Sequence, residues 1–243
     1  MLFLQLLFSV LLLNTCEVSS SPLFGTFIDG SNLDYKTHWT WLVGVDVITG
    51  SSGTIYPGIL VGAKWVLTAQ HIFNGASISR SRVWGGDKDL RESNVSNIRH
   101  VYRHSYDLAL VELVTPLNLV PITLPYPRYM PPSNARCFVA AWKFLHRLNK
   151  WHPVSADIEV TSCGRHYPHR FDTFCAIGTS STTRICQGDS GGPMFCYVGD
   201  RYILYGVVSE GQGDCNRKVS VPTLFSKVSQ EVNWIRSMVQ YLA

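Results

Sequence analysis

Residues 184–193 read RICQGDSGGP, and the second half of this stretch, from Gly188 to Pro193, decides what the rest of the chain must supply. A serine hydroxyl such as that of Ser190 is a weak nucleophile until a base takes its proton. Glycines on both sides permit a sharp turn on which backbone N–H groups can face a developing oxyanion. A plain Gly-rich hairpin can read the same way, so the interpretation depends on a base and an acid elsewhere in the chain.

Two other short stretches offer that base and that acid. His71 ends the apolar run WVLTAQH at residues 65–71, and Asp107 opens the strongly apolar run of YDLALVEL at residues 106–113. A lone histidine at a strand end is usually only polar surface. An acid that enters a buried strand costs free energy unless a group pairs with it, and an imidazole N–H is a suitable partner. Together the three residues stand in the chain order His, Asp, Ser.

LTAQH, YDLAL and CQGDSGGP resemble the three active-site blocks of the trypsin/chymotrypsin-like serine proteases, peptidase family S1. The resemblance covers roughly residues 28–240 and includes PLNLVPITLP after the aspartate, the GVVS run and the terminal NWI segment. It implies an all-β fold of two six-stranded antiparallel barrels with the site between them. It also implies a serine endopeptidase that needs no cofactor.

The residue pattern alone favours many short strands and a single helix at the end of the chain. Ser229 is predicted to cap that helix, with Glu231 in its first turn. The Pro-rich stretch 121–132 is the best linker candidate, which divides the chain into barrels at about 28–120 and 121–243. Six runs rich in β-branched and aromatic residues are predicted strands: WLVGVDV at 41–47, KWVLTA at 64–69, LALVELV at 108–114, CFVAAW at 137–142, YILYGVV at 202–208 and TLFSKV at 223–228.

The first residues, MLFLQLLFSVLLLN, are apolar and too short to span a bilayer comfortably. We interpret residues 1–20 as a signal peptide and 21–27 as a short propeptide before a protease domain at 28–243, with a signal anchor as the alternative. The mature protein is then expected to be secreted and extracellular, without a membrane partner. The net charge of +4 comes with no long Lys/Arg run, so no nucleic-acid partner is expected.

Six of the seven cysteines lie beyond the signal peptide, and an even number in an exported chain suggests three disulfides among fifteen pairings. The resemblance implies the pairs Cys137–Cys196, Cys163–Cys175 and Cys186–Cys215. No C-x2-C pair is present, and no metal site is expected. Asp87, Asp89 and Glu92 are interpreted as a solvated charge run rather than a calcium loop. Asn94-Val95-Ser96 is a glycosylation sequon.

The resemblance also assigns roles. Ser190 is the expected nucleophile, His71 the base and then the acid, and Asp107 the group that orients His71. The N–H groups of Gly188 and Ser190 form the expected oxyanion hole. Asp189 is the expected partner of an α-amino group created by a cut before Ile28. One family disulfide is missing, because Tyr56 and Ile72 occupy the two positions that it would join.

Two departures bear on activity. Phe27 precedes Ile28, so a trypsin-like activator is not expected to cut there. Either a chymotrypsin-like or other enzyme cuts, or the chain stays a single piece. Arg184 stands at the base of the substrate pocket, where trypsins carry Asp, with Ser209 and Gly211 on the rim and Thr223 on a wall. A cation there excludes trypsin-like specificity and leaves three alternatives: an acidic side chain, a small or unusual one, or a blocked pocket.

The expected partners are protein or peptide substrates and a protein protease inhibitor. Two other function classes stay open beside the enzyme: a protease homologue that binds without turnover, and a signal-anchored surface protein.

Overall fold

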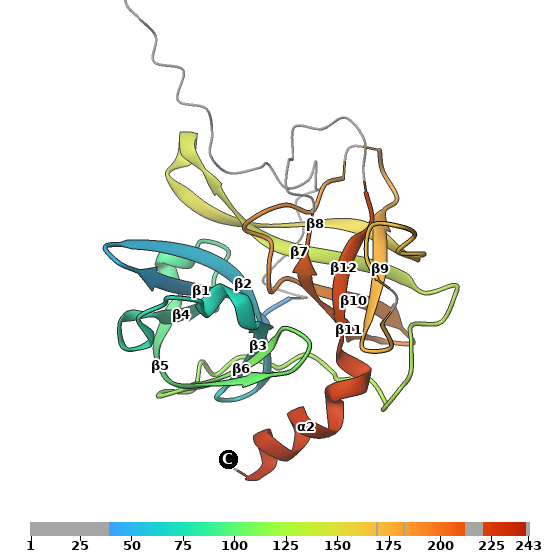
Figure 1. Ribbon diagram of the computed structural model, residues 1–243. Helices are drawn as coiled ribbons and strands as arrows, with labels where there is room; N and C mark the ends of the chain where they lie inside the picture. The colour runs from blue at the N-terminus through green and yellow to red at the C-terminus, as the bar shows by residue number, and fades with distance from the viewer. Residues whose placement is uncertain (1–38, 169, 182, 212–220, 242–243) are drawn as a thin grey trace, which may run out of the picture.

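The strands close into two antiparallel barrels of six, seen side by side in Figure 1. The protein is represented by a computed structural model that describes residues 39–168, 170–181, 183–211 and 221–241. The predicted signal peptide and propeptide, Ile28 and Cys215 lie outside the described residues. The expectation of an all-β fold with two six-stranded barrels and a C-terminal helix is confirmed.

The first barrel has the strand order β1-β2-β3-β6-β5-β4. Its strands are β1 (Leu42–Thr49), β2 (Ser52–Gly62), β3 (Trp65–Ala69), β4 (Arg82–Gly85), β5 (Asn94–His104) and β6 (Leu108–Leu113). Three short 3-10 helices interrupt it: η1 (Gln70–Phe73), η2 (Ile78–Arg80) and η3 (Leu90–Glu92). β3 is buried along its whole length and pairs with β6. His71 follows β3 and Asp107 precedes β6, so both residues lie at the same end of this buried pair of strands.

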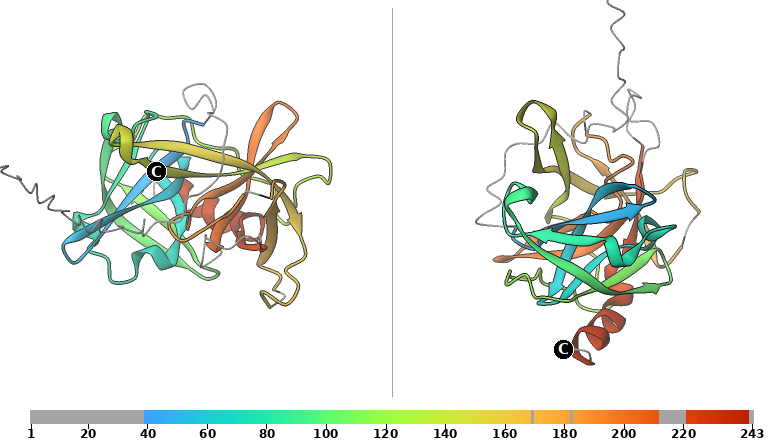
Figure 2. Two further views of the ribbon diagram at one scale, coloured as in Figure 1. Left: turned by 90° about the horizontal axis from the view of Figure 1, so that it is seen from above. Right: turned by 90° about the vertical axis from the view of Figure 1, so that its left-hand side faces the viewer.

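The second barrel has the strand order β10-β11-β12-β9-β8-β7. Its strands are β7 (Arg136–Leu145), β8 (Lys150–Thr161), β9 (Thr173–Gly178), β10 (Pro193–Val198), β11 (Arg201–Glu210) and β12 (Thr223–Lys227). The hairpin of β7 and β8 is closed by η4 (His146–Leu148) and by Asn149 in a left-handed conformation with φ 48°. Figure 2 shows this hairpin extending past its own barrel along the first one, where β7 meets β2 and β8 meets η3.

The helix α2 (Val228–Tyr241) follows β12 directly and confirms the predicted C-terminal helix. The prediction that Ser229 caps it is wrong. Ser229 lies inside the first turn, is 1% exposed, and its hydroxyl has no hydrogen-bond partner among the described residues. The strand continues straight into the helix, so no separate capping residue precedes the helical pattern. Val228 and Ile235 are fully buried and anchor α2 in the core cluster that also holds the first barrel.

A group of aromatic side chains packs between the barrels. Trp39 and Trp41 lie just before β1, and both meet the ring of Phe195 edge-on, at centroid distances of 4.9 and 4.7 Å. Phe195 lies in β10, shortly after Ser190, and also stacks on Phe138 of β7 at 5.5 Å. Edge-to-face and offset aromatic pairs have preferred geometries, so this cluster sets how the two barrels sit against each other.

Two of the expected disulfides are present. Cys137–Cys196 joins the paired strands β7 and β10, and Cys163–Cys175 closes the loop before β9. Cys186 is also disulfide-bonded, and its expected partner Cys215 lies outside the described part of the chain.

Apolar packing fills the place of the missing family disulfide. Ile72 is 6% exposed, and Tyr56 packs against the core cluster to which Ile72 belongs. Within the described ranges no helix has the length and apolar character needed to cross a membrane.

Candidate active site

Asp107 sits in a three-residue turn between β5 and β6. The ladder pairs His104 with Leu108, so Ser105, Tyr106 and Asp107 must reverse the chain between them. Tyr106 and Asp107 both adopt left-handed conformations, with φ 65° and 59°. Asp tolerates this conformation, whereas a bulky residue such as Tyr rarely adopts it. The backbone N–H of Gln70 donates to the carbonyl of Asp107 at 3.0 Å, which ties the turn to η1.

Three donors hold the Asp107 carboxylate. The backbone N–H of His71 donates to Oδ1 at 2.9 Å, and His71 Nδ1 lies 2.7 Å from Oδ2. The hydroxyl of Ser209 on β11 donates to Oδ2 at 2.6 Å. Because an ionised carboxylate can only accept, Nδ1 is the donor, which leaves Nε2 of a neutral imidazole free to accept a proton. The side chain of Asp107 is 23% exposed and that of His71 41%, so the histidine is open to a substrate.

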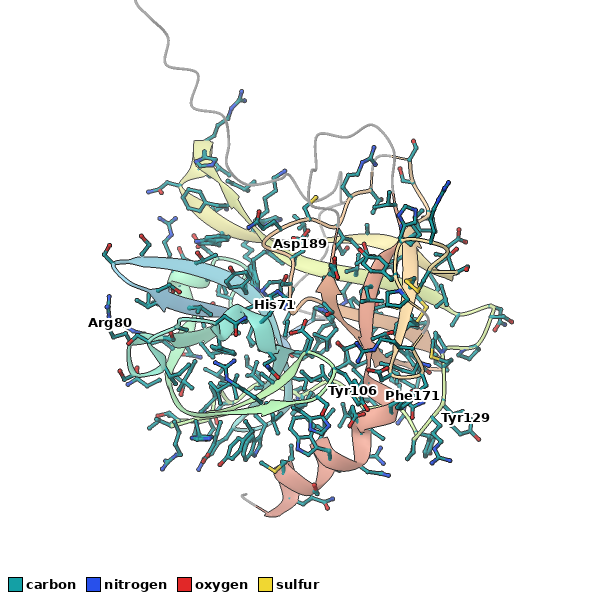
Figure 3. All side chains as sticks on the ribbon, viewed as in Figure 1. His71, Arg80, Tyr106, Tyr129, Phe171 and Asp189 are labelled. Carbon is teal, nitrogen blue, oxygen red and sulfur yellow. A yellow bond between two sulfur atoms is a disulfide. The ribbon has the colours of Figure 1, made fainter. Side chains whose placement is uncertain are left out.

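Ser190 faces that nitrogen from the other barrel. His71 Nε2 lies 2.9 Å from Ser190 Oγ, and Figure 3 labels His71 where the first barrel meets the second. The serine loop is tied to β11, because Gly191 N–H donates to Val208 O at 2.9 Å and Val208 N–H donates to Gly192 O at 2.8 Å. The structure therefore brings His71, Asp107 and Ser190 into one hydrogen-bonded chain.

Glycine is required in this loop for a specific reason at Gly191. Its φ is 86°, and a Cβ atom there would lie 2.6 Å from the carbonyl oxygen of Pro57 on β2. The loop lies directly on the first barrel at this point. A larger residue would move Ser190 away from His71, so the glycine contributes to the alignment of the site.

Asp189 points into the protein, not toward the substrate. It is 5% exposed, and its Oδ2 accepts a hydrogen bond from the N–H of Cys186 at 2.8 Å. Burial raises the pKa of the Asp189 carboxyl well above its usual range, and the single backbone donor offsets this only in part. The expected partner, the α-amino group of Ile28, lies outside the described residues.

The resemblance assigns Arg184, Ser209, Gly211 and Thr223 to a substrate pocket, and all four residues come from the second barrel. Arg184 is half-buried, and its guanidinium donates to the backbone carbonyls of Ser181 and Thr183. Gly211, just after β11, lies close to Ile185, since a Cβ atom on it would lie 2.7 Å from the carbonyl oxygen of Ile185. Thr223 begins β12 and is 2% exposed.

The remaining sequence-predicted sites lie on the first barrel. Asn94 is exposed at the start of β5, whereas Ser96 of the same sequon is buried and accepts from the N–H of Thr115 at 3.0 Å. The carboxylate of Asp89 accepts hydrogen bonds from the backbone N–H and the guanidinium of Arg91, so its charge is paired within its own loop. In the part of the chain that the structure describes, no cluster of three or more His, Cys, Asp or Glu could hold a metal ion.

Two contacts were not predicted from the sequence. Ser209 is expected only as a pocket-rim residue, yet its hydroxyl reaches the Asp107 carboxylate. Ser226 on β12 donates to the carbonyl of Tyr106, one residue before Asp107. Both serines lie in apolar strand patterns, where a single small polar residue carries no signal of its partner.

Comparison with known proteins gives a consistent result. The trypsin family matches residues 28–235. Serine protease 28 of Mus musculus is 28% identical over 275 residues, an alignment that covers 99% of this chain and 98% of that protein. The crystal structure of the scabies mite inactivated protease paralogue S-I1 has a similar fold, with a TM-score of 0.72 and 23% identity over 87% of this chain and 99% of that one. With the match over most of its length, the chain belongs to the trypsin family of serine proteases.

Proposed function

We propose that the protein is a secreted serine endopeptidase of non-tryptic specificity that acts through an acyl-enzyme on Ser190. The observation that carries this proposal is the unbroken chain of contacts from Asp107 Oδ2 through the His71 ring to Ser190 Oγ, at 2.7 and 2.9 Å. Hydrogen-bond geometry of this kind is what a nucleophile, its base and an orienting acid require.

The chemistry follows from the positions of the atoms. Ser190 Oγ attacks the peptide carbonyl carbon while its proton passes to His71 Nε2, and the imidazolium is stabilised by Asp107. The tetrahedral intermediate collapses with cleavage of the C–N bond, and the proton on Nε2 passes to the leaving amine. Water then gives a proton to the same nitrogen and attacks the ester carbonyl carbon. The bond from that carbon to Ser190 Oγ breaks, the carboxylic acid product leaves, and the proton on Nε2 returns to Oγ. The N–H groups of Gly188 and Ser190 are the proposed donors to the oxyanion, and Gly188 has the positive φ of 100° that such a loop requires.

Activation by cleavage before Ile28 belongs to the proposal. The buried carboxyl of Asp189 has a raised pKa, and a new α-amino group is a suitable counter-charge for it. Because Phe27 precedes the cut, the activating enzyme is proposed to be chymotrypsin-like, or another enzyme of non-tryptic specificity.

The pocket supports cleavage after small residues. The resemblance assigns Arg184 to the base of the pocket, where a cation would repel an entering Lys or Arg side chain. The close approach of Gly211 to Ile185 leaves little width for a long side chain of either sign. Among the three alternatives, these two observations favour a small P1 residue, the residue that precedes the scissile bond.

Export, glycosylation and a protein inhibitor complete the proposal. The apolar run before residue 15 supports a signal peptide, and Asn94 is exposed. Protein or peptide substrates follow from the family. Residues 28–120 and 121–243 are proposed as the two halves of the mature domain.

A protease homologue that binds without turnover is the second candidate. Arg184 and the unusual activation site favour it, and the scabies mite protein of similar fold is an inactivated protease paralogue. The complete triad of this chain favours the enzyme.

Fluorophosphonate labelling of the secreted protein tests the proposal. We expect one covalent adduct that disappears in Ser190→Ala and stays in Ser237→Ala, a serine of α2. A mature chain that begins well before Ile28 and never labels would favour the second candidate.

A further inference from the structure

Two serines on neighbouring strands of the second barrel reach across to the turn that carries Asp107. Ser209 on β11 donates to the carboxylate, and Ser226 on β12 donates to the backbone carbonyl of Tyr106. The strands are paired, with Ser226 opposite Val207 and Ser209 at the register shift between Val208 and Glu210, so both donors come from neighbouring parts of one sheet. We infer that Ser226 is a positioning residue for Asp107 and acts through the conformation of the Tyr106–Asp107 turn.

The turn needs such a restraint because its backbone is strained. Left-handed conformations cost roughly 1–2 kcal/mol for each non-glycine residue, and two stand here in succession. Strain of this kind persists only where the surroundings impose it. The direction of the Asp107 side chain depends on these two φ angles. A relaxed turn would point the carboxylate away from the N–H and Nδ1 of His71.

The Ser226 hydroxyl is well placed to impose the conformation. Ser226 is 0% exposed, so its hydroxyl has no access to water and depends on a partner in the protein. The Tyr106 carbonyl that it binds belongs to the peptide group between the two left-handed residues. A bond to this carbonyl therefore fixes the orientation of the peptide that enters Asp107.

The ring of Tyr106 is held by the same region of the second barrel. Phe171 meets it edge-on at 5.9 Å, and the two residues are labelled near each other in Figure 3. The guanidinium of Arg170 lies 5.7 Å from the ring centroid and pairs with the buried Asp172. Lys227, the residue after Ser226, donates to the carbonyl of Phe171 at 2.9 Å. Backbone and ring of Tyr106 are thus restrained from one side.

The test compares Ser226→Ala with Ser81→Ala. Ser81 is equally buried, and its hydroxyl donates to the carbonyl of Ser77 at 2.9 Å, but it lies by η2, remote from the triad. We expect Ser226→Ala to lower kcat about tenfold with little change in KM, the effect of one lost buried hydrogen bond. Ser226→Thr, which keeps the hydroxyl, should recover most of the rate. Ser81→Ala should leave kcat unchanged.

A second measurement does not depend on turnover. The proton between His71 Nδ1 and Asp107 Oδ2, 2.7 Å apart, is expected to give a far-downfield NMR resonance. We expect this resonance to shift or broaden in Ser226→Ala and to persist in Ser81→Ala. The kinetic comparison rests on the proposed function, whereas the NMR comparison does not. A wild-type protein without activity would sink the proposed function and leave the positioning role to be decided by the resonance.

Tyr106→Gly supplies the decisive background. Glycine adopts the left-handed conformation without strain, so loss of the Ser226 hydroxyl should lower kcat less in this background. The comparison can be made on soluble protein even if Ser226→Ala alone folds poorly. An equal effect of Ser226→Ala in both backgrounds would overturn the inference. An unchanged resonance and an unchanged kcat in Ser226→Ala would do the same.

Discussion

The Nε2 atom of His71 lies 2.9 Å from the Oγ atom of Ser190, although the two residues belong to different barrels. Neither barrel contains the complete triad, because His71 and Asp107 come from the first barrel and Ser190 comes from the second. Any change that alters the packing between the barrels therefore alters the chemistry. This relationship underlies the first two predictions.

Asp107→Asn should lower kcat by about four orders of magnitude while the fold is kept, a magnitude taken from the family's own triad. An amide presents a donor where the carboxylate accepts from His71 Nδ1 and Ser209, so the imidazole no longer offers a free acceptor to Ser190. Steady-state hydrolysis of a peptide substrate measures the effect. Asp157→Asn, which changes a half-exposed partner of Arg136, is the control and should keep full activity.

Phe195→Ala should reduce the free energy of unfolding by about 3–5 kcal/mol, because a fully buried ring leaves a cavity between the barrels. Tyr197→Ala changes another aromatic residue of β10 whose ring is 48% exposed, and it should cost far less. Chemical denaturation followed by tryptophan fluorescence measures both. Equal losses in the two variants would contradict a structural role for the inter-barrel cluster.

Asp189→Asn should make the uncut chain more stable at neutral pH. The folded pKa of Asp189 is raised by burial, so the folded state holds its proton more tightly than the unfolded state. Its contribution to stability is then fully present below about pH 4, the unfolded pKa, and is lost as the pH rises through the folded pKa. Denaturation between pH 4 and 8 should show a falling stability that is flatter in Asp189→Asn.

A matched measurement distinguishes activation from simple burial. After cleavage before Ile28, the wild-type protein should gain stability at neutral pH relative to the uncut chain, and Asp189→Asn should gain less. The same pH dependence in wild type and variant would show that another group titrates.

Peptides with Lys or Arg in the P1 position should not be cleaved. In Arg184→Gly, discrimination against Lys relative to the small, uncharged Ala should fall about tenfold or more, because like charges in a binding site repel by several kcal/mol before solvent screening. A library of P1-varied peptides measures this ratio. Arg136→Gly removes an exposed cation at the start of β7 and should leave the ratio unchanged. Cleavage by the wild type after Lys or Arg would contradict the pocket assignment.

The strands that the sequence predicts are those with uninterrupted apolar or β-branched runs, such as β3, β6 and β7. Two of the missed strands, β5 and β8, carry a different pattern. β5 reads NVSNIRHVYRH, with one face in the core and polar side chains on the other, and β8 contains Pro153. Both are stabilised by their neighbours in a closed barrel, a long-range effect that short windows do not contain.

The site divides in the same way. The triad was predictable because each member lies in a distinctive local motif, and the structure brings the three together. The bond from Ser209 to Asp107 and the bond from Ser226 to Tyr106 join residues about a hundred positions apart. Both contacts depend on how β11 and β12 are placed against the Tyr106–Asp107 turn, and this placement is visible only in the folded chain.

The aromatic cluster between the barrels has a consequence for how the chain folds. Trp39 stands at the beginning of the described chain and Phe195 near its end, so their contact forms only after most of the polypeptide is available. Contacts of such long sequence separation slow folding, because the loop entropy is lost before the contact forms. The two barrels are thus expected to reach their final arrangement late, and the reactive serine to meet its base only in a chain that is otherwise complete.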